Sequence, residues 1–151
     1  MKVAIVGYGK MGKEIEKILL ERGHTIVCKL QTKPTVDDLK GAEVAIEFSN
    51  PEAAFENIKF LLENKIPTIS GTTGWTDRLD EIIQINEDNN AAFLYASNFS
   101  LGVNLFFELN THLAQLMAKY PEYKAELEEI HHTQKLDKPS GTAITLAEQI
   151  L

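Results

Sequence analysis

The feature that most constrains the fold is a glycine fingerprint near the N-terminus, GYGKMG at positions 7–12. A short β-branched run, Lys2 to Val6, precedes it, and apolar residues at helical spacing follow between Lys13 and Arg22. This order predicts a buried strand, a tight turn and a helix. A second apolar run, His24 to Leu30, predicts the next strand. Strand, GxGxxG, helix and strand together indicate a dinucleotide-binding α/β fold.

Each glycine of the fingerprint has its own physical role. Gly7 permits the tight turn, Gly9 lets the backbone approach a pyrophosphate, and Gly12 lets helix and strand pack closely. The helix N-terminus then offers free N–H groups and a positive dipole end to the phosphates. A glycine-rich turn that binds nothing is the alternative.

The end of the second predicted strand bears on the choice of cofactor. Residues 29–33 read KLQTK and contain no acidic residue for the ribose 2′-hydroxyl. A carboxylate there would repel a 2′-phosphate, whereas Lys29 or Lys33 could attract one. The sequence therefore favours NADPH or dual use over strict NADH use. Solvated loop charges without a ligand are the alternative reading of these lysines.

The rest of the first hundred residues continues the alternation of strands and helices. The helix after the third strand should begin at Asn50-Pro51-Glu52, because Asn caps helices well and Pro suits their first position. We expect a Rossmann-type parallel sheet with helices on both faces. The remaining predicted elements are strands at Glu43–Phe48, Pro67–Ser70 and Ala91–Ala96, a helical turn at Asp37–Lys40, a helix at Asp77–Glu87, and a buried helical stripe of Phe55, Ile58, Leu61 and Leu62.

A second glycine-containing loop, Gly71-Thr72-Thr73-Gly74, follows the fourth predicted strand. Open α/β sheets bind ligands at the carboxyl ends of their strands. The hydroxyls and amides of this loop suit a ribose or a carboxamide, and a turn without a ligand is the alternative.

The pattern changes after Ala96, where we expect the start of a second, α+β domain. We place a dinucleotide-binding domain at residues 1–98 and a second, C-terminal domain at residues 99–151. Tyr123 to His131 alternates loosely and predicts a strand. A helix from about Val103 to Lys119 should precede it and bury Leu105, Phe106, Leu109, Leu113 and Leu116.

The segment from Glu129 to Ala143 carries the reactive side chains. His131 and His132 would point to opposite faces of a strand, and histidine is well suited to donate a proton near neutral pH. Lys135 adds a cation that can hold an anionic substrate. A helix that begins after Ser140 would expose the amides of Gly141 and Thr142 as a carboxylate site. A surface loop with accidental histidines is the alternative, and we expect no metal because adjacent histidines are poorly spaced for one ion.

Composition excludes several classes of partner. The formal net charge of −7 over 151 residues argues against nucleic acid. Cys28 is the single cysteine, so no internal disulfide can form, which is typical of a reducing compartment. No apolar run has the length of a signal or membrane segment, and we expect a cytoplasmic location without a membrane partner.

The sequence closely resembles the bacterial 4-hydroxy-tetrahydrodipicolinate reductases, also called dihydrodipicolinate reductases, of lysine and diaminopimelate biosynthesis. The resemblance runs through nearly all 151 residues. It rests on GYGKMG at 7–12, GTTG at 71–74, ASNFSLGVN at 96–104 and EIHH at 129–132 with Lys135 and DKPSGTA at 137–143. The last of these motifs is highly specific.

The resemblance implies reduction of 4-hydroxy-tetrahydrodipicolinate, a cyclic dicarboxylate, to tetrahydrodipicolinate with loss of water and with NADH or NADPH as cofactor. It assigns proton donation to His131, with Lys135 as a second donor. It places the substrate at His132, Ser140, Gly141 and Thr142. The implied cofactor-binding residues are Gly7, Tyr8, Gly9, Lys10, Met11, Gly12, Gly71, Thr72, Thr73, Ala96, Ser97, Asn98 and Phe99.

Members of the resembled family continue well beyond the position of Leu151 and typically form homotetramers. The resemblance therefore implies that residues 99–151 are a truncated substrate-binding domain, and that this chain binds cofactor better than it turns over. The competing function is a non-enzymatic NAD(P)H-binding module or redox sensor. That function would explain the glycine fingerprint and leave His131, His132 and Lys135 without a task.

Overall fold

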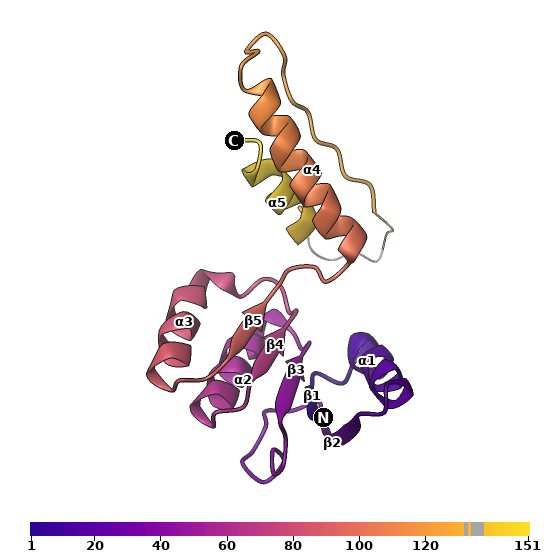
Figure 1. The fold of residues 1–151 in the computed structure, drawn as a ribbon, viewed down its shortest axis with the longest axis vertical. Coiled ribbons are helices and arrows are strands. Elements are labelled where there is room, and N and C mark those ends of the chain that lie inside the picture. The colour runs from indigo at the N-terminus through magenta and orange to yellow at the C-terminus, as the bar shows by residue number, and fades with distance from the viewer. Residues whose placement is uncertain (132, 134–137) are drawn as a thin grey trace. The chain divides into compact units, whose positions relative to one another are not determined.

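The computed structural model describes residues 1–131, 133 and 138–151 (Figure 1). The chain divides into two compact units, Met1–Ala96 and Ser97–Leu151. His132 and Lys135, two of the predicted site residues, lie outside the described residues.

The N-terminal unit is built on a parallel five-stranded sheet of order β2-β1-β3-β4-β5, and every neighbouring pair is parallel. The predicted Rossmann-type sheet is therefore confirmed. The order reverses direction beside β1, because β2 lies on one side of it and β3 on the other. The strands are β1 (Lys2–Val6), β2 (Thr25–Leu30), β3 (Val44–Glu47), β4 (Thr68–Ser70) and β5 (Phe93–Tyr95).

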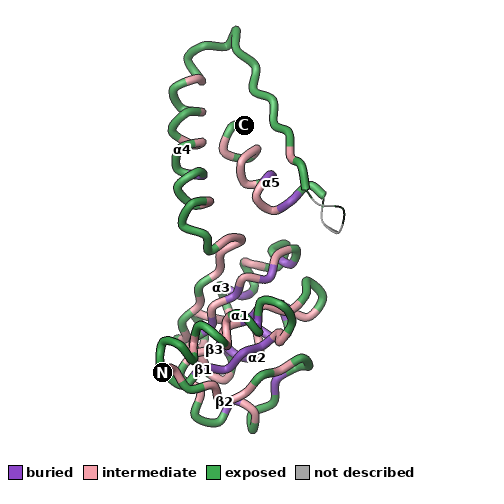
Figure 2. The backbone as a smooth tube through the Cα atoms, turned by 90° about the vertical axis from the view of Figure 1, so that its right-hand side faces the viewer, coloured by how far each residue is buried: buried purple, intermediate pink, exposed green. Residues whose placement is uncertain are grey.

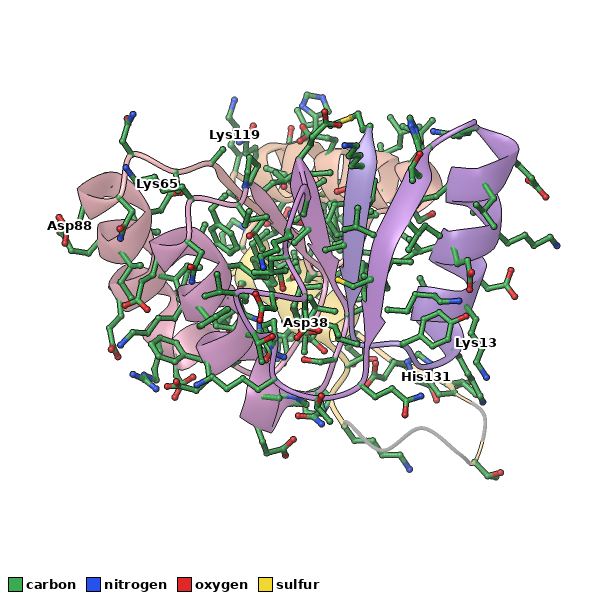
Figure 3. The ribbon with its side chains drawn as sticks, turned by 90° about the horizontal axis from the view of Figure 1, so that it is seen from below. Lys13, Asp38, Lys65, Asp88, Lys119 and His131 are labelled. Carbon is green, nitrogen blue, oxygen red and sulfur yellow. The ribbon has the colours of Figure 1, made fainter. Side chains whose placement is uncertain are left out.

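Helices cover both faces of this sheet, with α1 on one side and α2 and α3 on the other (Figure 3). Their bounds are α1 (Lys10–Glu21), α2 (Pro51–Glu63) and α3 (Leu79–Asp88), with a short 3₁₀ helix η1 (Thr76–Arg78) ahead of α3. Residues 36–41 form turns between β2 and β3, and Leu39 from these turns is buried against Ala4 and Val6.

Helix α2 forms as predicted from its capping residues and its apolar stripe. The Asn50 side chain accepts a hydrogen bond from the Ala53 N–H at 2.9 Å, and Pro51 occupies the first helical position. All four residues of the predicted stripe are buried, and they contribute to the purple core of Figure 2. Each such side chain stabilises the fold by roughly 1.5–3 kcal/mol relative to an exposed position.

The C-terminal unit contains α4 (Leu101–Met117) and α5 (Gly141–Glu148) among its described residues. The prediction of a strand at Tyr123–His131 is wrong, because these residues are outside any helix or strand. Loose alternation is a weak signal, and a strand also needs a neighbouring strand to pair with its N–H and C=O groups.

The predicted buried stripe of α4 is also wrong. Among the described residues α4 packs against α5, and the side chain of Asn110 donates to the Leu146 carbonyl and to the Gln149 side chain, both at 3.0 Å. Phe107 is the buried residue of the helix, while Leu105, Phe106, Leu109, Leu113 and Leu116 are each half exposed or more (Figure 2). An eight-residue helix is too short to cover the apolar surface of a seventeen-residue one. Within the described ranges, no helix is long and apolar enough to span a membrane.

A buried carboxylate joins the carboxyl ends of two strands in the N-terminal unit. Glu47, the last residue of β3, is 0% exposed. It accepts hydrogen bonds from the Ser70 hydroxyl at 2.6 Å, the Thr72 hydroxyl at 3.0 Å, and both the N–H and the hydroxyl of Ser49. An ionised carboxylate can accept all four bonds, which offset the cost of removing it from water.

We predict that Glu47→Gln lowers the free energy of unfolding by about 1–3 kcal/mol, because an amide brings two donors to a site where every neighbour donates. Glu87→Gln, at an exposed position of α3, is the matched control and should change stability by less than about 0.5 kcal/mol. Urea unfolding of both variants makes the comparison. Equal stabilities would contradict a structural role for the Glu47 carboxylate.

Candidate functional site

The glycine fingerprint forms the turn between β1 and α1. Gly7 has φ +92°, and a Cβ there would overlap the backbone of Phe48. Its N–H and that of Tyr8 donate to the Leu30 carbonyl at 2.9 and 3.0 Å, which ties the turn to the end of β2. The turn therefore depends on glycine for its backbone conformation and for the contact with the β3 loop.

The other two glycines differ in what surrounds them. A Cβ at Gly12 would overlap the Gly7 carbonyl, so this position sets how closely α1 approaches β1. Among the residues that the structure describes, no atom lies within 4 Å of a Cβ placed at Gly9. Gly9 stands at the N-cap of α1, and the first-turn amides of Lys10, Met11 and Gly12 have no helical partner four residues earlier. This combination of open backbone and free amides suits a phosphate.

Side chains beside the fingerprint form a charge cluster. The Tyr8 hydroxyl donates to Glu16, and Lys29 donates to the other oxygen of Glu16 at 3.1 Å while its Nζ lies 5.2 Å from the Tyr8 ring centroid. The hydrogen bond with Glu16 raises the pKa of Tyr8, and the bonds from Tyr8 and Lys29 lower the pKa of Glu16. The charge of Lys29 is thus already matched by a carboxylate.

A cavity of about 310 Å³ opens next to Gly7, between the loops that follow β2 and β3. Lys33 lines this cavity and reaches Glu56 at 3.5 Å, a long and exposed ion pair. The lining residues are Gly7, Gln31, Thr32, Lys33, Ser49, Asn50, Ala53, Glu56 and Asn57. Lys33 thus lines a cavity next to Gly7, whereas Lys29 lines a different cavity between α1 and β2.

Glu47 holds the Gly71–Gly74 loop in place by accepting hydrogen bonds from the hydroxyls of Ser70 and Thr72. The Thr72 hydroxyl accepts from the Ser49 N–H at 2.8 Å, and the Thr72 carbonyl accepts from the buried Trp75 indole N–H at 2.7 Å. A Cβ at Gly71 would overlap the ring of Phe48. The loop is therefore packed onto the β3 loop, at the same edge of the sheet as Gly7.

Residues Ala96 to Phe99 lie at the division between the two units. Ala96 belongs to the first unit, where its N–H donates to the Ser70 carbonyl at 3.3 Å. In the second unit, the Asn98 side chain accepts from the Ser100 N–H at 2.8 Å and its carbonyl accepts from the Asn104 side chain at 3.1 Å. These contacts fix the entry to α4.

The reactive segment is organised by Glu129. Its carboxylate accepts from the Ser140 hydroxyl at 2.6 Å and from the Ser140 N–H at 3.0 Å, and it lies 3.1 Å from His131 Nε2. The Ser140 hydroxyl also caps α5 by accepting from the Ala143 N–H at 3.0 Å, as predicted. Gly141 and Thr142 then supply the first two amides of that helix. His131 is labelled in Figure 3.

Two residues of this arrangement were absent from the expectations based on sequence. Glu47 stands in an apolar strand, Val44-Ala45-Ile46-Glu47-Phe48, where an acidic side chain signals a buried polar network. Glu129 stands two residues before His131 but eleven before Ser140, so its contact with the α5 N-terminus has no local signal.

Comparison with known proteins supports a family for the whole chain. The family model described as "Dihydrodipicolinate reductase, N-terminus" matches residues 1–99, and the one described as "Dihydrodipicolinate reductase, C-terminus" matches residues 102–151. The division between these matches falls close to the boundary between the two units of the structure.

Curated relatives and a solved structure agree with these matches. A 4-hydroxy-tetrahydrodipicolinate reductase from Christiangramia forsetii is 54% identical over 100% of this chain and 64% of its own length. One from Streptococcus uberis is 36% identical over 99% of this chain and 64% of its own length.

The solved structure is a dipicolinate-bound dihydrodipicolinate reductase from Paenisporosarcina sp. TG-14. It is 30% identical and superposes with a TM-score of 0.71 over 99% of this chain and 65% of its own. The chain thus spans just under two thirds of the length of each of these relatives. On the family matches and these identities, the chain belongs to the dihydrodipicolinate reductase family.

Proposed function

We propose that this chain carries the cofactor site and the proton-donating segment of a 4-hydroxy-tetrahydrodipicolinate reductase. The reaction reduces 4-hydroxy-tetrahydrodipicolinate to tetrahydrodipicolinate with loss of water, using NADH or NADPH. The observation that carries the proposal is the coverage of the whole chain by the two family matches, together with His131 and the α5 N-terminus on one hydrogen-bonded segment.

The N-terminal unit fits a dinucleotide. Open backbone at Gly9, free amides at the start of α1 and the neighbouring cavity suit a pyrophosphate and an adenosine ribose. When bound, the reduced nicotinamide supplies a hydride. We assign the cofactor to Gly7–Gly12, Gly71–Thr73 and Ala96–Phe99. We place the dinucleotide-binding domain at residues 1–98 and a substrate-binding domain at residues 99–151.

The C-terminal unit supplies the proton and the anion site. His131 donates a proton to the substrate, and Lys135 assists as a second donor; Lys135 lies outside the described residues. The amides of Gly141 and Thr142 bind a substrate carboxylate at the positive end of α5. His132, which lies outside the described residues, also binds the substrate. Ser140 contributes by capping that helix, since its hydroxyl and N–H are bonded within the protein. We propose that the whole protein is a cytoplasmic homotetramer.

The decisive assay follows NAD(P)H oxidation by the whole natural protein with the condensation product of pyruvate and aspartate semialdehyde. We expect turnover, and we expect His131→Gln to lower kcat by about 10²–10⁴-fold because it removes the proton donor. Cofactor binding should be unchanged in this variant. Binding of NAD(P)H without substrate-dependent oxidation would favour a redox sensor, and a His131→Gln variant with full kcat would exclude the proton-donor role.

Substitutions at Gly9 and Gly7 should affect different properties of the protein. We expect the first to weaken cofactor binding and the second to destabilise the fold. Gly9→Ala should weaken NAD(P)H binding at least tenfold while changing stability by less than about 1 kcal/mol, since its methyl would touch no atom of the described residues and would occupy the place of the pyrophosphate. Gly7→Ala should destabilise the fold by more than about 2 kcal/mol, because φ is positive and the methyl overlaps Phe48. Fluorescence titration and urea unfolding measure the two effects. Wild-type affinity in Gly9→Ala would refute a pyrophosphate at that position.

Lys33, which lines the cavity next to Gly7, should contribute to the affinity for the 2′-phosphate of NADPH. We expect Lys33→Ala to raise KM for NADPH roughly fivefold and to leave KM for NADH unchanged. A fivefold change corresponds to the loss of one exposed ion pair with the 2′-phosphate, worth about 1 kcal/mol. Lys29→Ala is the comparison variant, because Lys29 does not line the cavity beside Gly7 and its ion pair with Glu16, at 3.1 Å, is shorter than the 3.5 Å pair of Lys33 with Glu56. Equal changes for both cofactors in Lys33→Ala would contradict this assignment.

A further inference from the structure

The Glu129 carboxylate makes contacts with two parts of the proposed site at once. One oxygen, Oε2, lies 3.1 Å from His131 Nε2 and accepts from the Ser140 hydroxyl at 2.6 Å. The other, Oε1, accepts the Ser140 N–H at 3.0 Å. The side chains of Glu129 and His131 are 24% and 35% exposed, so this contact is partly shielded from water.

The charge state of Glu129 determines whether its partners must donate hydrogen bonds to it. The Ser140 hydroxyl and N–H, and then His131, hold the pKa of Glu129 below its ordinary value of 4.5. Glu129 is therefore ionised at neutral pH and can only accept hydrogen bonds. The His131 nitrogen that faces it, Nε2, must carry a proton, which leaves Nδ1 as the ring nitrogen for the substrate.

Ser140 extends the contact to the anion site. Its hydroxyl donates to Glu129 and accepts from the Ala143 N–H at 3.0 Å, so the cap of α5 is oriented by the carboxylate. A continuous series of hydrogen bonds thus runs from the His131 ring through Glu129 and Ser140 to the first turn of α5. That turn supplies the Gly141 and Thr142 amides.

We propose that Glu129 is a positioning residue that holds the His131 imidazole, protonated on Nε2, and the anion-binding turn of α5 in one arrangement. The inference rests on the proposed function and adds to it the residue that orders its two parts. Positioning matters because a displacement of about 1 Å between reacting groups can cost about 10²-fold in rate. Glu129 itself transfers no proton in this arrangement.

Steady-state kinetics of the whole protein provide the first test. Glu129→Gln keeps the size of the side chain but loses the paired acceptors, and we expect kcat to fall about 10²-fold with KM for NAD(P)H changed less than threefold. Glu129→Asp keeps the charge with a shorter reach, and it should recover part of kcat. Glu128→Gln, at the exposed neighbouring position, is the matched control and should behave as wild type.

The tautomer of His131 provides a second test that a merely structural role would not affect. Long-range ¹H–¹⁵N spectra of the neutral imidazole should show protonation on Nε2 in the wild type and in Glu128→Gln. In Glu129→Gln the Nε2–H tautomer should lose its dominance. A wild-type His131 protonated on Nδ1 would overturn the inference by itself, whether or not the Glu129→Gln variant folds.

The outcomes separate this inference from the proposed function. Absence of turnover in the wild type would refute the proposed function, while the tautomer would still report on the contact between Glu129 and His131. An active wild type with Glu129→Gln retaining kcat within threefold would overturn the positioning role alone. Loss of kcat together with the tautomer change would support it.

Discussion

The burial of one carboxylate at the end of β3 fixes the edge of the sheet on which the proposed cofactor site depends. Parallel strands bring their carboxyl ends to the same edge, so the loops after β1, β3 and β4 converge there. Glu47 accepts four hydrogen bonds from the β3 loop, the end of β4 and the β4 loop. A carboxylate removed from water is tolerated only with such partners, and the same hydrogen bonds hold the loops after β3 and β4 against one another.

The C-terminal unit also contains a carboxylate that accepts several hydrogen bonds, Glu129, but its surroundings differ from those of Glu47. Glu129 is only partly buried, and one of its partners is the imidazole of His131. Glu47 organises backbone that receives a ligand, whereas Glu129 contacts a side chain that we assign to the chemistry. A carboxylate suits both tasks because its two oxygens accept bonds from several directions.

Sequence patterns predicted the N-terminal unit well because its helices and strands are covered on well-defined faces. The Phe55 to Leu62 stripe on α2 and the Asn50 cap formed as expected. The same reasoning failed for α4, whose leucines at helical spacing are exposed, and for Tyr123 to His131, which forms no strand. Periodicity reports which residues could be buried, but burial requires a partner surface, and among the described residues α5 is too short to provide it.

The sequence by itself determined the strand, turn and helix of the glycine fingerprint, the Ser140 cap and the family to which the chain belongs. The turn and the cap depend on local backbone conformation and short-range hydrogen bonds, which a few neighbouring residues specify, and the family follows from motifs that are present in the sequence itself. Only the tertiary structure decided that Glu47 joins Ser70 and Thr72, that Lys29 pairs with Glu16 and Lys33 with Glu56, and that Glu129 reaches Ser140 at the start of α5. Each of these contacts joins residues that the fold brings together across the chain or between loops, and spacing in a sequence carries no direct record of such distances.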